Sequence, residues 1–307
     1  MDNSFDVIVL GGGPAGLTAG IYLGRSKAKT LILDTGMPGG QMVLTYEIAN
    51  YPGIESISGY QLSSAMKKQA KSFGCILKSN VKISHIRLEG KTKEIILDKG
   101  ETVTAPVVIL ATGGRSRMLN VPGEDTFKGR GISYCATCDG DFFQDKEIIV
   151  VGGGNSALEE AVALTKYARK VTILHEFDHF QAFEHAVEEA KAHPKIDFIM
   201  EAHITEFYGD ESLKGVKYKN LKTGEVFSKN IDGVFIFIGY EANTQTLQNG
   251  PVKLNQWNEI VTDENLQTNI EGVFAAGDCR AKRYRQITTA VADGTVAALN
   301  ALQYLHK

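Results

Sequence analysis

The chain of 307 residues has little of what marks several classes of protein. Four cysteines are too few for a disulfide scaffold in a chain this long. A formal net charge of −3 gives no overall electrostatic basis for binding nucleic acid or an anionic membrane. No apolar run approaches the roughly 20 residues that a membrane-spanning helix needs. We therefore expect a globular protein with neither a nucleic acid nor a membrane as partner.

The N-terminal segment also lacks the basic region and cleavage site of a signal peptide, so we expect a cytoplasmic protein. Two of the four cysteines in the chain, Cys135 and Cys138, form a C-x-x-C pair. In a cytoplasmic protein such a pair indicates redox chemistry or half of a metal site. No second C-x-x-C accompanies the pair, and the histidines between residues 175 and 193 do not form a recognised metal set. Redox chemistry without a metal is the better interpretation.

A dinucleotide-binding pattern opens the chain. The stretch FDVIVLGGGPAGLTAGIYLGRSKAKTLILD predicts a strand, a glycine turn, a helix over 14–26 and a second strand ending at Asp34. In the turn, Gly11 allows the sharp bend, Gly13 lets the backbone approach a pyrophosphate, and Gly16 lets helix and strand pack closely. Asp34 can accept hydrogen bonds from ribose hydroxyls.

The same pattern recurs at KEIIVVGGGNSALEEAVALTKYARKVTILHE, with Gly152, Gly154 and Ala157 in the turn. A third block near the end, GVFAAGDCRAKRYRQITTAVADG, predicts a strand, a Gly-Asp turn and a long helix that complete the first fold. We predict an α/β protein with two Rossmann-like dinucleotide-binding domains, the second inserted into the first. Residues 1–114 and 245–307 form the first domain, and residues 115–244 form an NAD(P)-binding-like domain that carries the C-x-x-C pair.

The motifs GGGPAG, GGQ, NYPG, ATG, CATCDG, GGGNSA, AAGD and RQITTA, in this order and spacing, resemble those of the low-molecular-weight thioredoxin reductases over essentially the whole chain. The resemblance implies a homodimeric flavoprotein that binds FAD and reduces thioredoxin. It implies that Cys138 is the thiol nearer the flavin, that Cys135 attacks the substrate disulfide, and that Asp139 serves as the acid.

The resemblance also implies a set of FAD-binding positions, some from the first glycine turn and others spread along the chain. They are Gly11, Gly13, Pro14, Ala15, Gly16, Asp34, Gly39, Gly40, Gln41, Thr45, Asn50, Ala111, Gly113, Gly277, Asp278, Arg285 and Gln286.

The segment HEFDHFQA departs from the family. NADPH-dependent members read H-R-R-x-x-x-R after this strand, whereas this chain keeps His175 and has Glu176, Phe177 and Gln181 at the arginine positions. A 2′-phosphate needs cationic donors, and a carboxylate repels it. In one interpretation Glu176 accepts the ribose 2′-hydroxyl of NADH. In the other, which we favour, the donor is reduced ferredoxin, as in the ferredoxin-dependent flavin thioredoxin reductases that the chain then resembles.

The stretch RAKRYRQ places Arg280, Lys282, Arg283 and Arg285 close together, and we advance the hypothesis that they dock an acidic ferredoxin. The alternative is that Arg285 contacts the flavin or a dimer partner while the others are solvated. An alternative function of another class is a flavin-binding redox regulator without catalytic activity.

Overall fold

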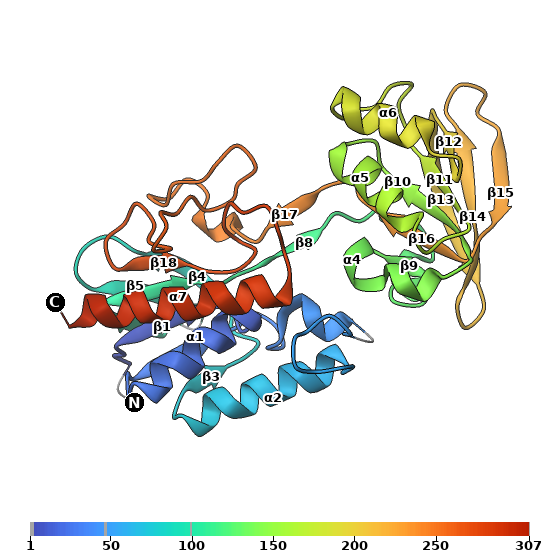
Figure 1. The fold of residues 1–307 in the computed structure, drawn as a ribbon. Coiled ribbons are helices and arrows are strands. Elements are labelled where there is room, and N and C mark those ends of the chain that lie inside the picture. The colour runs from blue at the N-terminus through green and yellow to red at the C-terminus, as the bar shows by residue number, and fades with distance from the viewer. Residues whose placement is uncertain (1–2, 46–47, 99, 307) are drawn as a thin grey trace. The chain divides into compact units, whose positions relative to one another are not determined.

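The computed structural model describes residues 3–45, 48–98 and 100–306, and the chain divides into two compact units (Figure 1). Unit 1 comprises residues 1–115 and 241–307, and unit 2 comprises residues 116–240. The sequence-based boundaries, 114/115 and 244/245, fall close to these divisions. The chain leaves unit 1 through β8 (Gly114–Ser116) and returns through β17 (Tyr240–Ala242), and these two strands pair with each other.

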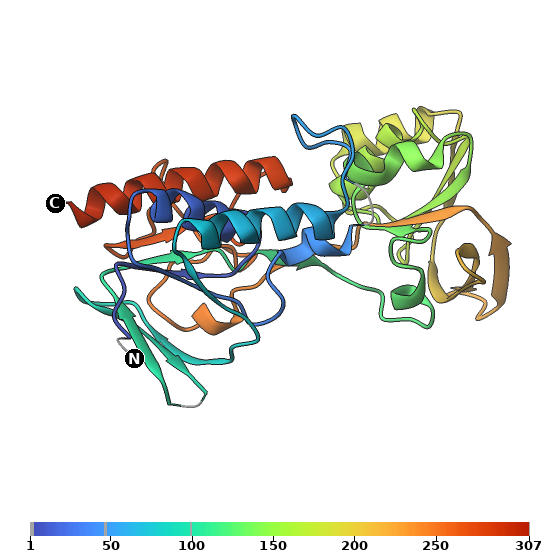
Figure 2. The same cartoon turned by 90° about the horizontal axis from the view of Figure 1, so that it is seen from below.

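Unit 1 is built on a parallel sheet of five strands in the order β18-β7-β1-β2-β3. The strands are β1 (Val7–Leu10), β2 (Thr30–Leu33), β3 (Ile76–Lys78), β7 (Val107–Leu110) and β18 (Val273–Ala275). One face of the sheet is covered by α1 (Pro14–Arg25), α2 (Gly59–Ser72) and α7 (Ile287–Leu305). The opposite face carries the antiparallel strands β4 (Ile83–Arg87), β5 (Lys93–Leu97) and β6 (Thr102–Ala105) (Figure 2).

This two-sided cover explains why the central strands are apolar runs with no polar alternation. Val7 and Val9 of β1 pack with the helices, whereas Ile8 and Leu10 pack with the antiparallel strands. All four side chains are at most 1% exposed. The sheet is therefore fixed from both sides, and its carboxyl edge is the place where loops are free to build a site.

Unit 2 repeats the plan. Its parallel sheet has the order β12-β11-β10-β16-β9, with β9 (Ile132–Ser133), β10 (Glu147–Val151), β11 (Lys170–Leu174), β12 (Ile196–Ile199) and β16 (Gly233–Ile236). Helices α5 (Asn155–Leu164) and α6 (Glu184–Ala192) cover one face, and strands β13 (Ala202–Gly209), β14 (Leu213–Asn220) and β15 (Val226–Asn230) form an antiparallel sheet whose buried side chains pack on the other. Two single-turn helices, α3 (Glu124–Phe127) and α4 (Ala136–Asp139), complete the unit. The predicted α/β class with two dinucleotide-binding folds is confirmed.

Short 3₁₀ segments lie at Gly40–Leu44, Gly140–Phe143 and Gln245–Leu247. Helix α1 begins at Pro14, whose fixed φ suits the first helical position, and ends at Arg25, one residue before the predicted end. Among the described residues, no helix has both the length and the apolar character needed to cross a membrane.

Helices α1 and α7 pack through small residues. A Cβ placed on Gly294 of α7 would lie 2.2 Å from the Ala15 carbonyl oxygen of α1, and a Cβ on Gly277 would lie 2.9 Å from the Ala15 Cβ. The two helices can approach this closely because Gly294 has no side chain. This contact holds the C-terminal helix against the first glycine turn.

We predict that Gly294→Ala lowers the free energy of unfolding of the protein by about 1–3 kcal/mol, because the added methyl group overpacks the contact with Ala15. A loss of stability would identify the tight contact as its cause, because alanine in place of glycine ordinarily stabilises a helix. Urea unfolding measures the effect, and Gln303→Ala, an exposed position on the same helix, is the control that should change little. Equal stability of Gly294→Ala and the parent would contradict the packing account.

Candidate active site

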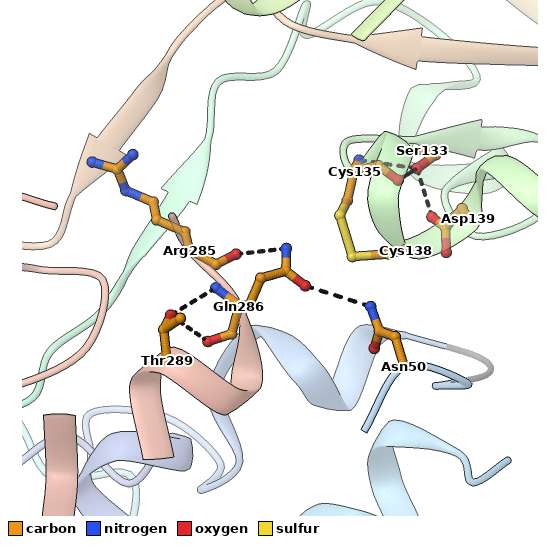
Figure 3. Close-up of a disulfide and its surroundings, with 8 residues drawn as sticks. All are labelled: Asn50, Ser133, Cys135, Cys138, Asp139, Arg285, Gln286 and Thr289. Carbon is orange, nitrogen blue, oxygen red and sulfur yellow. Dashed lines mark hydrogen bonds between the residues drawn. A yellow bond between two sulfur atoms is a disulfide. The ribbon is translucent and has the colours of Figure 1, made fainter. Parts of the chain in front are cut away.

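A disulfide joins Cys135 and Cys138 at the carboxyl edge of the unit 2 sheet (Figure 3). Strand β9 ends at Ser133, Cys135 has an extended backbone, and Cys138 lies within α4. Both cysteines are half-buried, so the sulfur atoms lie at the surface of the unit and not in its core. The sequence prediction of a redox pair is therefore matched by a formed bond.

Asp139 is held beside the disulfide by two hydrogen bonds. Ser133 Oγ donates to Asp139 Oδ2 at 2.5 Å, and the Asp139 N–H donates to the Cys135 carbonyl oxygen at 3.2 Å. Burial raises the pKa of Asp139, the hydrogen bond from Ser133 lowers it, and the charge of Asp141 raises it further. The net rise suits a carboxyl group that must hold and release a proton next to a sulfur atom.

The residues just before the disulfide are anchored as well, which the sequence did not indicate. Tyr134 donates from its hydroxyl to Glu124 Oε1 at 2.8 Å, and the same carboxylate accepts the N–H groups of Leu119 and Asn120 at 3.0 and 2.6 Å. Glu124 is 1% exposed. A buried carboxylate with three donors is a firm anchor for the chain that leads into Cys135.

The first glycine turn of unit 1 has the geometry of a dinucleotide site. Gly11 has a φ of 108°, and a Cβ there would lie 2.1 Å from the Ala111 carbonyl oxygen. The N-cap of α1, Gly13, has no side-chain hydrogen bond, which leaves the first turn of the helix open toward an anion. Asp34 follows β2 and accepts the Gly12 N–H at 2.7 Å.

The loop after β2 lies directly against this turn. The Gly39 N–H donates to the Gly12 carbonyl oxygen at 2.7 Å, and a Cβ on Gly40 would lie 3.1 Å from the Gly13 Cα. The two predicted glycine clusters therefore lie against each other. Gln41, the second residue of the 3₁₀ segment Gly40–Leu44, is exposed. Thr45 ends that turn, half-buried, and its carbonyl accepts the Gly59 N–H at 3.1 Å.

Residues from the end of the chain reach the same edge. Gly277, with a φ of 78°, follows β18, as Ala111 follows β7, and the Asn243 N–H donates to the Gly113 carbonyl oxygen at 2.9 Å. Burial raises the pKa of Asp278, while Lys282 and Arg285 lower it.

Gln286 starts α7. Its N–H donates to Thr289 Oγ1 at 3.2 Å, and Asn50 Nδ2 donates to its side-chain oxygen at 3.4 Å (Figure 3). Gly11, Ala111 and Gly277 thus follow three neighbouring parallel strands of unit 1, and the use of these positions by FAD stays a prediction.

The basic cluster RAKRYRQ is tied into ion pairs. Arg280 Nε and Lys282 Nζ lie 2.9 and 2.8 Å from Asp293 Oδ2, and Arg285 pairs with Glu259. Arg283 alone among the four basic residues has an exposed side chain. The interpretation of Arg280 and Lys282 as solvated cations is corrected here, because Asp293 holds both of them, whereas Arg283 is exposed and its role in docking stays a prediction.

Asp293 is the residue that sequence reasoning missed. It is 8% exposed, and besides the two cations it accepts the Gly277 N–H at 3.0 Å. The signal was a lone acid on the small-residue face of the predicted helix, three positions after Ala290 and four before Ala297. A buried acid at such a position implies a cationic partner.

The second glycine turn, in unit 2, repeats the first with one change. Gly152 has a φ of 135°, and a Cβ there would lie 2.4 Å from the Phe237 carbonyl oxygen. The position after β11 holds His175 where unit 1 holds Asp34. The imidazole is 5% exposed and lies over Gly153, since a Cβ there would be 2.4 Å from its Nε2. Burial lowers the pKa of His175, so the ring is neutral at pH 7.

Carboxylates and aromatic rings surround this turn. Glu176, Phe177 and Asp178 are exposed, and Lys222, whose charge acts on Asp178, is paired with Glu201 at 2.6 Å. Lys222 is therefore already engaged by a carboxylate.

The same segment also closes onto the turn. The Gln181 N–H donates to the Gly153 carbonyl oxygen at 2.8 Å, and the Phe183 N–H donates to Asn155 Oδ1 at 2.7 Å.

Within the described residues, no three His, Cys, Asp or Glu side chains gather as a metal site would require.

We predict that Asp293→Asn costs about 3 kcal/mol at neutral pH, because it leaves two partly buried cations without their anion. Burial raises the pKa of Asp293, but the hydrogen bonds from Arg280 and Lys282 outweigh it and lower the pKa below its ordinary value. The contribution of Asp293 is therefore complete above the unfolded pKa of about 3.9 and is lost as the pH falls through the lower folded pKa. Urea unfolding at neutral and acidic pH should show the difference from the parent shrinking only in acid. The exposed Glu264→Gln should show no such loss.

Known proteins match the chain over its whole length. The family model for pyridine nucleotide-disulphide oxidoreductases matches residues 5–294. A thioredoxin reductase of Peptoclostridium acidaminophilum is 45% identical, with 99% of this chain and 98% of the relative covered. A 34.2 kDa protein in the rubredoxin operon of Clostridium pasteurianum is 43% identical over the same shares of both chains.

Among solved structures, the thioredoxin reductase of Streptococcus pyogenes superposes with a TM-score of 0.95 at 39% identity, covering 100% of this chain and 99% of that one. The glycine turns and the disulfide thus occur in a chain that matches such enzymes from end to end. The chain belongs to the pyridine nucleotide-disulphide oxidoreductase family, in its group of low-molecular-weight thioredoxin reductases.

Proposed function

We propose that this protein is an FAD-dependent, cytoplasmic and homodimeric disulfide oxidoreductase that reduces thioredoxin through Cys135 and Cys138, with electrons from reduced ferredoxin. The observation that carries the disulfide chemistry is the Cys135–Cys138 bond with Asp139 beside it in the same turn. The relatives named thioredoxin reductase support thioredoxin as the partner.

The residues of unit 1 fit FAD. The uncapped first turn of α1 offers N–H groups to a pyrophosphate, and the facing glycines Gly13 and Gly40 leave the backbone bare on that side. Asp34 accepts the N–H groups of Gly12 and Gly36 at 2.7 and 2.8 Å, and its oxygen atoms keep further lone pairs for ribose hydroxyls. When bound, a flavin takes up electrons singly or as a hydride and can deliver them in pairs.

The chain's own residues then carry out thiol–disulfide exchange. The Cys135 thiol passes its proton to Asp139 and attacks the partner disulfide, so a Cys135–partner bond forms while the partner bond breaks. The departing partner sulfur takes the proton from Asp139. The Cys138 thiol next attacks Cys135 Sγ, which restores the intramolecular disulfide and breaks the Cys135–partner bond, and the Cys138 proton passes to the second partner sulfur as it is released. Two electrons and two protons move from the dithiol to the partner.

We predict that Cys138→Ser forms a lasting mixed disulfide with thioredoxin, because Cys135 attacks and nothing resolves the adduct. The substrate is a thioredoxin that lacks its second cysteine and carries thionitrobenzoate on the first. Release of the yellow thiolate and a non-reducing gel report the adduct. Cys135→Ser should react at least roughly tenfold more slowly, because the remaining thiol is not the attacking one. Equal rates would remove the distinction between the two cysteines, a faster reaction of Cys135→Ser would reverse their roles, and no adduct from either variant would favour a flavin-binding regulator.

The surroundings of the second glycine turn support a donor other than NADPH. Where an arginine pair would face a 2′-phosphate, Glu176 and Phe177 are exposed, and the neutral His175 ring adds no charge. Arg283, the exposed member of the basic cluster, remains as a candidate contact for an acidic ferredoxin. One relative is named for its place in a rubredoxin operon.

NADH is the second candidate donor, and one observation favours it. His175 Nε2 is buried and has no hydrogen-bond partner among the described residues, although it lies at the glycine turn. A dinucleotide on that turn would give it one, and Glu176 could accept the ribose 2′-hydroxyl.

We predict that the triple variant Glu176→Arg, Phe177→Arg, Gln181→Arg gains NADPH binding, with a Kd lowered by about 100-fold or more, because each charge-assisted bond to a phosphate contributes about 1.5–3 kcal/mol. Titration calorimetry measures it without any turnover. The control makes the same change of net charge at exposed positions of the β13–β15 sheet and its β13–β14 turn, Glu211→Arg, Val226→Arg and Ser228→Arg. An equal gain in both variants would show that net charge, and not the position of the cations, governs binding.

A further inference from the structure

We propose that Ser133 is a positioning residue that fixes which oxygen of Asp139 carries the exchangeable proton. The proposal rests on the thiol–disulfide exchange assigned above to Cys135 and Cys138. It deepens that function by adding a residue which does not touch the substrate and acts through Asp139.

The geometry around the Ser133 hydroxyl allows one arrangement. The hydroxyl has a single proton and can give it to Asp139 Oδ2 at 2.5 Å or to the Cys135 carbonyl oxygen at 3.3 Å. The shorter contact, to a carboxylate, is the stronger one. The lone pairs of Oγ accept the Cys135 N–H at 3.1 Å. A chain of two bonds therefore runs from the Cys135 amide through Ser133 to Asp139 Oδ2 (Figure 3).

Ser133 is well placed to act as a fixed point. It is 5% exposed and ends β9, where it lies opposite Phe235 of β16 in the parallel sheet. The next residue, Tyr134, is bonded to the buried Glu124. The hydroxyl thus belongs to the rigid sheet, whereas Asp139 and the cysteines belong to the short turn after it. The hydrogen bond from Ser133 Oγ therefore holds the Asp139 carboxyl group in a fixed position relative to the strand.

With Oδ2 accepting from Ser133, the proton of Asp139 is carried on Oδ1. No other hydroxyl or cation acts on this carboxyl among the described groups. Asp141, in the same turn, repels the charged form, and burial disfavours it as well. Helix α5, which packs against α4, carries Glu160, whose pKa is raised by burial and by Glu159. Ser133 is therefore the group that keeps Asp139 able to ionise, as it must in order to accept the Cys135 proton.

The test uses two pairs of variants that differ by a hydroxyl, parent against Ser133→Ala and Ser133→Thr against Ser133→Val. The full-length flavoprotein is reduced to the dithiol, and its single-turnover reaction with 5,5′-dithiobis(2-nitrobenzoate) is followed against pH. Infrared difference spectra, assigned with Asp139→Asn, report the ionisation of Asp139. Neither readout needs thioredoxin or a physiological donor.

Loss of the hydroxyl should move the Asp139 ionisation and the acidic limb of the rate profile to higher pH by about one unit, because the ionised form loses its donor. In Ser133→Thr, which keeps a hydroxyl, the Asp139 ionisation and the acidic limb of the rate profile should both lie at lower pH than in Ser133→Val. Tyr134→Phe, which removes the neighbouring bond to Glu124, should leave the Asp139 ionisation unchanged.

A uniform loss of rate at every pH, with the Asp139 ionisation unmoved in alanine and valine alike, would reduce Ser133 to a structural residue and overturn the proposal. Absence of exchange in the parent protein would instead refute the proposed function. In that case the infrared shift still decides whether Ser133 acts on Asp139.

Discussion

Both units depend on a close approach of backbone to backbone that only glycine permits. In unit 1 the turn after β1 passes so near the end of β7 that a Cβ on Gly11 would lie 2.1 Å from the Ala111 carbonyl oxygen. In unit 2 a Cβ on Gly152 would likewise lie 2.4 Å from the Phe237 carbonyl oxygen. Both glycines have a positive φ. This approach brings a helix N-terminus to the carboxyl edge of each parallel sheet, and the residues that follow the neighbouring strands are gathered there with it.

The two turns share a backbone plan and differ in what surrounds it. In unit 1 the acid Asp34 follows β2, and bare glycines face the turn, so the edge can take a pyrophosphate and a ribose. In unit 2 the buried imidazole of His175 takes the place of the acid. The backbone N–H groups of Gln181 and Phe183 donate hydrogen bonds to Gly153 and Asn155 of the turn, so residues that carry side chains face the turn where unit 1 has glycines. The same scaffold thus carries a glycine turn with an acid beside it in one unit, and a disulfide turn with a histidine at the second glycine turn in the other.

The repeated strand–turn–helix pattern is local in sequence, so both folds, the helix at Pro14–Arg25 and the C-x-x-C pair could be predicted from it. The roles assigned to FAD-binding positions came from the resemblance and stay predictions. A local sequence pattern could not predict the pairing of charges that lie apart in the chain. From the sequence, Arg280 and Lys282 resemble a solvated basic patch, whereas in the structure both form ion pairs with Asp293. The bond from Ser133 to Asp139 was hidden for a related reason, because a short helix had to turn the acid back toward the strand.

Anaerobic reduction of the oxidised flavoprotein shows where its electrons come from. NADPH, NADH and photochemically reduced ferredoxin are added separately, the flavin absorbance is followed, and oxidised thioredoxin is then supplied. We expect that ferredoxin bleaches the flavin and that thioredoxin restores its colour, while NADPH has no effect. Rapid bleaching by NADPH would refute ferredoxin as the donor, because a carboxylate and a phenyl ring would then stand where a 2′-phosphate binds.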